Sequence, residues 1–215
     1  MKNDHITGAE MALQRSSIYG LLSLLYSREP DVNLLSCLRE QNLLDHLIEA
    51  GMTLNKQEFT TAPVEEVREN LAIDYTSLFI ASTGKRIPLN ESIHHQQEGH
   101  FWGHSTVEVN DFIRFLGMTI DNDWTGFPDH IAVEFEVMKK LVESEQVALE
   151  QNNQDRAKKC RKLQREFLDG HISHWVPQVC ERIIHQAQTS FYKELAALTK
   201  DFIEHECQSF GSVRK

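Results

Sequence analysis

The residues best suited to acid–base chemistry lie together in the stretch PDHIAVEFEVM, residues 128–138. His130 and Glu134 are four residues apart, so a helix would place this imidazole and this carboxylate on one side, next to Asp129. Such a pair can act as a general base, but a base needs a nucleophile or a bound substrate. The chain has no GxSxG, Walker or GxGxxG motif to supply either. The residue types alone therefore favour structural roles, with Asp129 supporting a helix start and His130 making a hydrogen bond.

Four histidines, His94, His95, His100 and His104, invite a second chemical interpretation, a metal site. His100 and His104 have the i, i+4 spacing of helical ligands, yet there is no HExxH motif and no obvious third ligand. We therefore expect no bound metal. An α-helical metal-dependent hydrolase stays an alternative only if this cluster converges with His130, which an assay of bound metal would decide.

The spacing of the cysteines and the net charge of the chain argue against further classes of function. Cys37, Cys160, Cys180 and Cys207 are widely spaced and form no CxxC pair, which is typical of buried or half-buried thiols. The formal net charge of −10 argues against a general nucleic-acid binder, which would need a basic surface. An acidic chain instead suits a basic partner.

These groups depend on one organising helix, which we expect to begin after Gly126 and to continue to about Gln151. Pro128 and Asp129 suit a first helical turn, because proline lacks an N–H that would be unpaired there and a carboxylate is favoured by the helix dipole. Apolar residues then recur every three to four positions and predict a buried face. They are Phe127, Ile131, Phe135, Met138 and Val142.

The rest of the chain also reads as helices. Thr7 and Glu10 form a capping box, and Pro63 begins a helix to about Ala81. Further helices are expected at about 32–39, 41–50, 101–116, 155–168, 171–188 and 190–207. Residues 82–99 form the main irregular connection. No strand alternation or repeat is visible, so we predict an all-α fold, one globular domain of about eight to ten helices.

We see no segment in the sequence that would direct the chain to export or into a membrane. The N-terminal residues MKNDHITGAEM contain no apolar signal core, and the apolar run Ile18–Tyr26 is too short to span a bilayer. There is no Arg-Arg pair of a twin-arginine export signal. We expect a cytoplasmic protein without stable membrane insertion.

Three blocks of sequence resemble the TorD/DmsD-like redox-enzyme maturation chaperones. The first is Pro128–Met138, and the second is FLDGHISHWVPQV, residues 167–179, with His171, Trp175 and Pro177. The third is YTSLF followed by IPLNES, within residues 75–92. The blocks occur in the family's order, and the resemblance extends over nearly the whole chain.

The resemblance implies a chaperone, not an enzyme, that binds the twin-arginine signal peptide and the apo form of a molybdenum-cofactor oxidoreductase of the DMSO/TMAO-reductase type. Such a chaperone aids cofactor insertion before export. A signal peptide has a basic head and an apolar helical segment, so it suits an apolar groove with acids at one end. We expect Glu91, Asp129 and Glu134 near the arginines. The full predicted client-binding set is Tyr75, Phe79, Pro88, Glu91, Ser92, Trp124, Pro128, Asp129, His130, Glu134, His171 and Trp175.

Three further expectations accompany this hypothesis. An assembly factor for a nitrate-reductase-like complex would share the fold without depending on a signal peptide. No cofactor is expected; the resemblance admits a guanosine nucleotide, but no phosphate-binding loop is visible. A hinge between halves at about 1–117 and 125–215 predicts a monomer that can form a domain-swapped homodimer.

Overall fold

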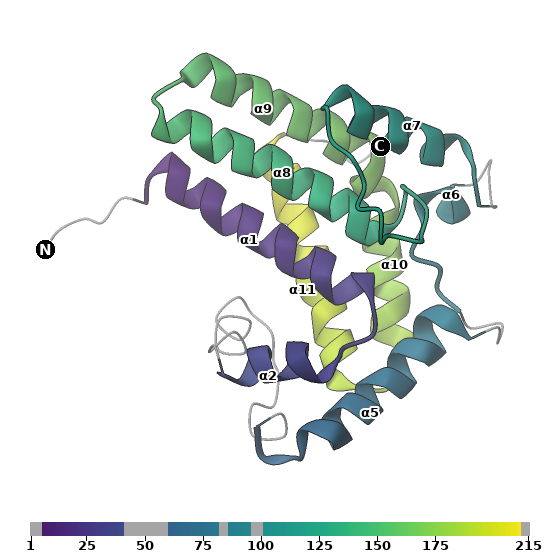
Figure 1. Ribbon diagram of the computed structural model, residues 1–215. Coiled ribbons are helices and arrows are strands. Elements are labelled where there is room, and N and C mark those ends of the chain that lie inside the picture. Colours follow the sequence, from purple (N-terminus) through teal and green to yellow (C-terminus); the bar gives the residue numbers. More distant parts are fainter. Residues whose placement is uncertain (1–5, 41–59, 82–85, 96–100, 212–215) are drawn as a thin grey trace, which may run out of the picture. The chain divides into compact units, whose positions relative to one another are not determined.

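The computed structural model describes residues 6–40, 60–81, 86–95 and 101–211 (Figure 1). Within these ranges the chain forms helices, and the one pairing of extended backbone is an isolated antiparallel bridge between Asn90 and His130. The all-α prediction is confirmed. The helix expected at 41–50 lies outside the described residues. None of the helices in the described ranges combines the length and apolar character needed to cross a bilayer.

The helices belong to two compact units. The first unit comprises residues 1–27, 90–175 and 207–215, and the second comprises 28–89 and 176–206. Each unit thus draws on both halves of the chain, so the units do not follow the boundary expected at 117–125. The predicted hinge and the exchange of halves stay predictions.

The first unit contains α1 (Gly8–Ser27), α6 (Glu91–His94), α7 (His104–Phe115), α8 (Ile131–Glu150), α9 (Gln154–Phe167) and the π-helical turn η2 (Leu168–Ile172). The second unit contains α2 (Val32–Glu40), α5 (Val64–Tyr75), the π-helical turn η1 (Thr76–Ile80) and most of α10 (Ser173–Gln186) and α11 (Ser190–Ser209).

Helix α1 begins with the predicted capping box. The Thr7 N–H donates to Glu10 Oε2 at 2.7 Å, and the Glu10 N–H donates to Thr7 Oγ1 at 3.2 Å. The helix packs along α8, where the rings of Tyr19 and Tyr26 lie 6.1 and 6.2 Å from that of Phe135. Aromatic contacts therefore join the first helix to the organising helix.

Helix α8 has the predicted core face but a different start. Ile131, Phe135 and Met138 are fully buried, as their spacing predicted. The helix begins at Ile131, with His130 as its N-cap: the Ala132 N–H donates to His130 Nδ1 at 3.2 Å. The prediction that Pro128 and Asp129 occupy the first turn was wrong, because the imidazole caps the helix and Asp129 bonds to a different segment.

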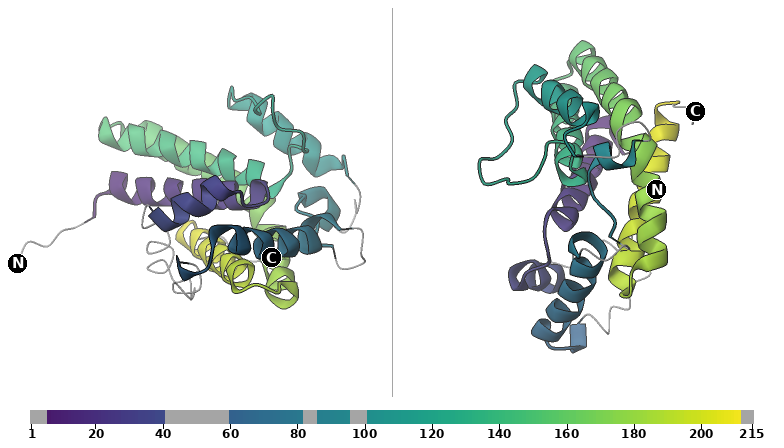
Figure 2. Two further views of the ribbon diagram at one scale, coloured as in Figure 1. Left: turned by 60° about the horizontal axis from the view of Figure 1, so that its bottom comes forward. Right: turned by 90° about the vertical axis from the view of Figure 1, so that its right-hand side faces the viewer.

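Helices α8 and α9 form an antiparallel hairpin and lie side by side in Figure 1; Figure 2 gives two further views of the fold. Its main polar anchor is the buried Glu145, whose carboxylate accepts from Arg15 at 3.0 Å, Arg161 at 3.3 Å and Gln164 at 2.9 Å. The guanidinium carbons of Arg15 and Arg161 also lie 5.6 and 4.7 Å from the centre of the Phe210 ring. One α9 cation, Arg161, thus pairs with an α8 acid, while Lys158 and its exposed neighbours face solvent.

The second unit has its own aromatic core. Tyr75 and Phe79 are buried, with ring centroids 6.2 and 5.9 Å from that of Tyr192. Beside them the buried Asp74 accepts from the N–H of Thr189 at 2.8 Å and from its hydroxyl at 2.7 Å. A carboxylate thus satisfies backbone donors at the start of α11.

Candidate functional site

Residues from all three sequence blocks meet in one buried polar network of the first unit. His171 Nδ1 lies 2.9 Å from Glu91 Oε2, and Trp175 Nε1 donates to Glu134 Oε2 at 3.2 Å. An ionised carboxylate can only accept, so an ionised Glu91 would fix the His171 hydrogen on Nδ1. The ring of His94 stacks on Trp175, with centroids 5.3 Å apart. The network joins α6, α8, η2 and the first turn of α10.

Asp129 ties the start of α6 to the start of α8. Its fully buried carboxylate accepts from the Ser92 N–H at 3.0 Å and from the Asn90 amide at 3.4 Å. Its backbone carbonyl accepts from the Glu91 N–H at 3.0 Å. Three groups of residues 90–92 therefore depend on Asp129 for their hydrogen bonds.

Glu134 lies in the middle of this network and is completely buried. Burial raises its pKa well above the ordinary value, and the neighbouring charge of Glu91 raises it further, while the Trp175 N–H acts in the opposite direction. Its Oε1 receives no hydrogen bond from the described residues. A protonated Glu134 resolves this, because its O–H can donate to the Glu91 carboxylate. Burial and the neighbouring Glu91 therefore favour the protonated, neutral form of the Glu134 side chain.

His130 is a poor general base in this setting. Desolvation lowers its pKa to about 4, and the charge of Asp129 offsets this only in part. Its ring lies edge-on to Trp124, with centroids 5.0 Å apart, and its Nδ1 is occupied by the cap of α8. The imidazole is therefore neutral at pH 7 and positions the helix.

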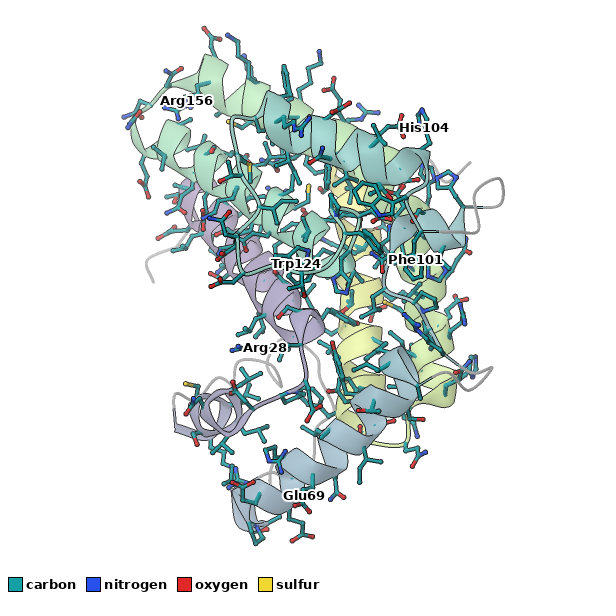
Figure 3. All side chains as sticks on the ribbon, turned by 45° about the vertical axis from the view of Figure 1, so that its right-hand side comes forward. Arg28, Glu69, Phe101, His104, Trp124 and Arg156 are labelled. Carbon is teal, nitrogen blue, oxygen red and sulfur yellow. The ribbon has the colours of Figure 1, made fainter. Side chains whose placement is uncertain are left out.

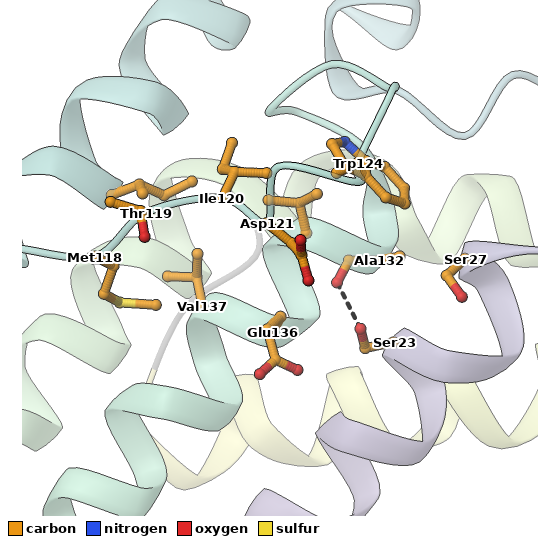
Figure 4. A pocket seen from close by; sticks show the side chains of 12 residues that line it. Ser23, Ser27, Met118, Thr119, Ile120, Asp121, Trp124, Ala132, Glu136 and Val137 are labelled. Carbon is orange, nitrogen blue, oxygen red and sulfur yellow. Dashed lines mark hydrogen bonds between the residues drawn. The ribbon is translucent and has the colours of Figure 1, made fainter.

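An apolar pocket of about 190 Å³ lies on another face of α8 (Figure 4). Its floor includes Val133 and Val137, and the connection after α7 forms one wall. On the opposite side the Ser23 hydroxyl of α1 donates to the Ala132 carbonyl at 2.8 Å. The remaining apolar lining includes Ile113, Met118, Ile120 and Trp124.

Two acids, Asp121 and Glu136, lie at the edge of this pocket. Asp121 is exposed, and its Oδ1 accepts from the Asp123 N–H at 3.0 Å within a tight turn. Both acids were missing from the predicted set, although Asp121 belongs to the acidic aromatic turn DNDWTGF that precedes α8. That composition was the signal that could have identified it.

The predicted client-binding residues fall into three groups. The buried network holds Glu91, Ser92, Asp129, Glu134, His171 and Trp175, and the half-buried His130 caps α8 beside it. Trp124 lines the pocket, and the half-buried Pro128 lies in the turn before α8. Tyr75, Phe79 and Pro88 belong to the second unit. The predicted acids are thus turned inward, and the acids that line the pocket are Asp121 and Glu136.

Of the four histidines considered for a metal site, the structure describes His94, His95 and His104. His100 lies outside the described residues. His104 is exposed and pairs with Glu108 at 2.9 Å, while His95 Nε2 lies 3.7 Å from Glu91 Oε1. Across the described ranges, no three His, Cys, Asp or Glu side chains are grouped so that they could hold a metal ion.

Comparisons with known proteins agree on one kind of relative. A family model described as nitrate reductase delta subunit matches residues 40–181. The perchlorate reductase assembly chaperone protein of Dechloromonas aromatica is 27% identical over 61% of this chain, which spans 59% of that relative's length. The selenate reductase assembly chaperone protein of Thauera selenatis is 25% identical over 66% of this chain and 72% of its own.

Two further matches cover more of the chain. The chaperone protein TorD of Salmonella agona is 24% identical over 86% of each chain. A solved structure described as a redox enzyme maturation protein of Archaeoglobus fulgidus matches 95% of this chain and 99% of its own, with a TM-score of 0.54 at 18% identity. This last similarity establishes the fold.

Proposed function

The chain belongs to the nitrate reductase delta subunit family, and on this basis we propose that it is an assembly chaperone for a molybdenum-cofactor oxidoreductase. Relatives named as assembly chaperones for perchlorate and selenate reductases support this, as does the TorD match along most of the chain. The chaperone holds the apo-enzyme in the cytoplasm until the cofactor is inserted. It performs no catalysis itself.

The observation that carries the proposal is the apolar pocket on α8 with acids at its edge. A twin-arginine signal peptide presents two arginines and then an apolar helical segment. The half-buried Val133 and Ile120 offer apolar surface for such a helix, and Asp121 offers a charge for the arginines. The acids at the edge of the pocket and its apolar lining thus match the arginines and the apolar segment of the peptide.

The buried network has a supporting part in this proposal. Asp129, His130 and Glu134 hold the first turn of α8, whose next residues, Ala132 and Val133, line the pocket. We therefore assign the network to positioning the pocket rather than to contacting the peptide. This assignment gives the family-like residues a role that agrees with their burial.

The proposal is tested by titrating the purified protein with a synthetic twin-arginine signal peptide in a calorimeter. Ile120→Asp places a charge in the pocket from a half-buried loop position, and Val107→Asp is the control, because Val107 is half exposed on α7 and does not line the pocket. Losing apolar contact of about 1–2 kcal/mol should weaken binding about five- to thirtyfold for Ile120→Asp alone. Failure of the wild type to bind, or equal loss in both variants, would reject the pocket as the site.

The family description favours one alternative, an assembly factor for a nitrate-reductase-like complex that ignores signal peptides. The two functions differ in what part of the client is recognised. Apo-enzyme with and without its signal peptide should be offered to the immobilised protein in parallel. Equal capture of both forms would establish the alternative, whereas loss of capture without the peptide supports the primary proposal.

A further inference from the structure

A second pocket of about 310 Å³ lies further along α8 than the first. Leu141 and Val147 of α8 line it together with Leu116 and Met118, and Arg156 of α9 contributes to its wall. Met118 lines both pockets, so the two adjoin at this side chain. The connection after α7 therefore borders both.

The α8 residues of the two pockets form one continuous stripe. Val133, Val137, Lys140, Ser144 and Val147 recur at intervals of three to four residues, which places them on the same face of the helix. From Ala132 to Val147 this face is about 22 Å long at 1.5 Å per residue. That length matches an apolar helix of about fifteen residues lying parallel to α8.

Charges distinguish the two ends of this stripe. Asp121 at the first pocket has no cationic partner among the described residues, and the Arg156 guanidinium at the second has no acidic one. Figure 3 shows Arg156 near the turn of the α8–α9 hairpin and Trp124 near the other end of α8. Between the ends the charges are satisfied locally, because Lys140 lies 3.1 Å from Glu143 and 3.7 Å from Glu136.

We propose that the two pockets form one directional groove, which binds a client helix with its basic N-terminal end at Asp121 and its C-terminal end at Arg156. The C-terminal turn of a helix carries unpaired carbonyls and a partial negative charge, which a guanidinium can satisfy. The proposal rests on the proposed function and deepens it by assigning the polarity of the bound segment. It also assigns a role to Arg156, an exposed cation of α9.

A charge-swap experiment tests the direction. The probes are two peptides with two arginines followed by about fourteen leucine and alanine residues, one ending in glutamate and the other in lysine. The wild type should bind the glutamate-ended peptide about two- to fivefold more tightly at low salt, as expected for one charge at a helix end. Arg156→Glu should reverse this preference. Lys158→Glu makes the same change of charge at an exposed α9 position outside the pocket and should keep it.

Three results would overturn the proposal. If Ile120→Asp weakens binding but Arg156→Glu leaves the preference unchanged, the peptide uses the first pocket alone, and the proposed function survives. If Lys158→Glu shifts the preference as much as Arg156→Glu, the preference comes from the overall charge of α9 and not from a contact with Arg156. If neither peptide binds the wild type, the groove and the signal-peptide function fail together.

A second measurement reports polarity without mutation. A photo-crosslinker at the C-terminal end of the glutamate-ended peptide should attach near Val147 or Arg156. A crosslinker beside its arginines should attach within 119–124. The reverse assignment by mass spectrometry would refute the stated direction.

Discussion

At the scale of single residues, the buried carboxyl groups of Glu91, Asp129 and Glu134 show what role the three sequence blocks have that resemble the family. A buried acid is costly unless its oxygens are hydrogen-bonded or it gives up its charge. Asp129 takes the first route, through backbone and amide donors, and the raised pKa of Glu134 favours the second. These acids therefore serve folding, and the raised pKa of Glu134 should be visible in the pH dependence of stability.

Glu134→Gln should make stability less dependent on pH. The folded protein holds the Glu134 proton more tightly than the unfolded chain, because its pKa lies above the ordinary 4.5. Its contribution is fully present below pH 4.5 and is lost as pH rises toward the folded pKa. Glutamine keeps a donor and an acceptor but cannot ionise. Urea unfolding at pH 5, 7 and 9 measures this. The free energy of unfolding of the variant should rise relative to that of the wild type as pH rises. Parallel profiles would show that folding does not raise the pKa of Glu134.

His130→Asn should act on the acid side of the profile. The imidazole pKa is about 4 when folded and 6.5 ordinarily, so its contribution is present above pH 6.5 and is lost as pH falls toward 4. The loss should amount to ~1–3 kcal/mol in the wild type. Asparagine can still cap α8 but does not titrate. The variant should therefore lose less stability between pH 7 and pH 4.5, while an unchanged loss would place the titration elsewhere.

Asp129 and Asp121 should separate folding from binding. Asp129→Ala leaves the Ser92 N–H and the Asn90 amide without their acceptor and should cost ~1–3 kcal/mol for each orphaned group. Asp121→Asn keeps the turn acceptor and should cost less than ~0.5 kcal/mol. Only Asp121→Asn should weaken the salt dependence of peptide binding in calorimetry. Loss of binding by a fully folded Asp129→Ala protein would return Asp129 to the contact surface.

At the scale of elements, α8 shows what the sequence could predict and what it could not. The core face followed from spacing alone, because Ile131, Phe135 and Met138 obey the helical period. The start did not, because the choice of cap depends on contacts with residues 90–92, about forty positions earlier. The burial of the Glu134 side chain could not be predicted for the same reason, because its Trp175 partner lies 41 residues away.

The α8–α9 hairpin gives a prediction at this scale. Glu145→Ala would leave the cations Arg15 and Arg161 and the Gln164 amide without a shared acceptor, and should lower the free energy of unfolding by ~2–4 kcal/mol. Glu143→Ala is the matched control, two residues earlier, where an exposed pair with Lys140 should be worth ~0–1 kcal/mol. Chemical denaturation measures both. Similar small losses would mean that solvent screens the Glu145 network.

At the scale of the whole molecule, each compact unit is assembled from segments distant in sequence. Neither 1–117 nor 125–215 contains a complete unit, since the first unit needs both α1 and α8. We therefore predict that each fragment alone lacks a cooperative thermal transition, and that mixing the two restores one. Circular dichroism melts of the fragments, apart and together, measure this. A cooperative melt by either fragment alone would show that a half is self-sufficient.

The separation between α1 and α8 also has a consequence during synthesis. The Ser23 hydroxyl and its Ala132 acceptor are 109 residues apart. At about 5–20 residues per second, roughly 5–20 s pass between their emergence from the ribosome. Throughout this interval Tyr19, Leu22 and Tyr26, all buried in the finished protein, lack the helix against which α1 packs. The assembly chaperone that we propose thus exposes apolar surface of its own until α8 has been made.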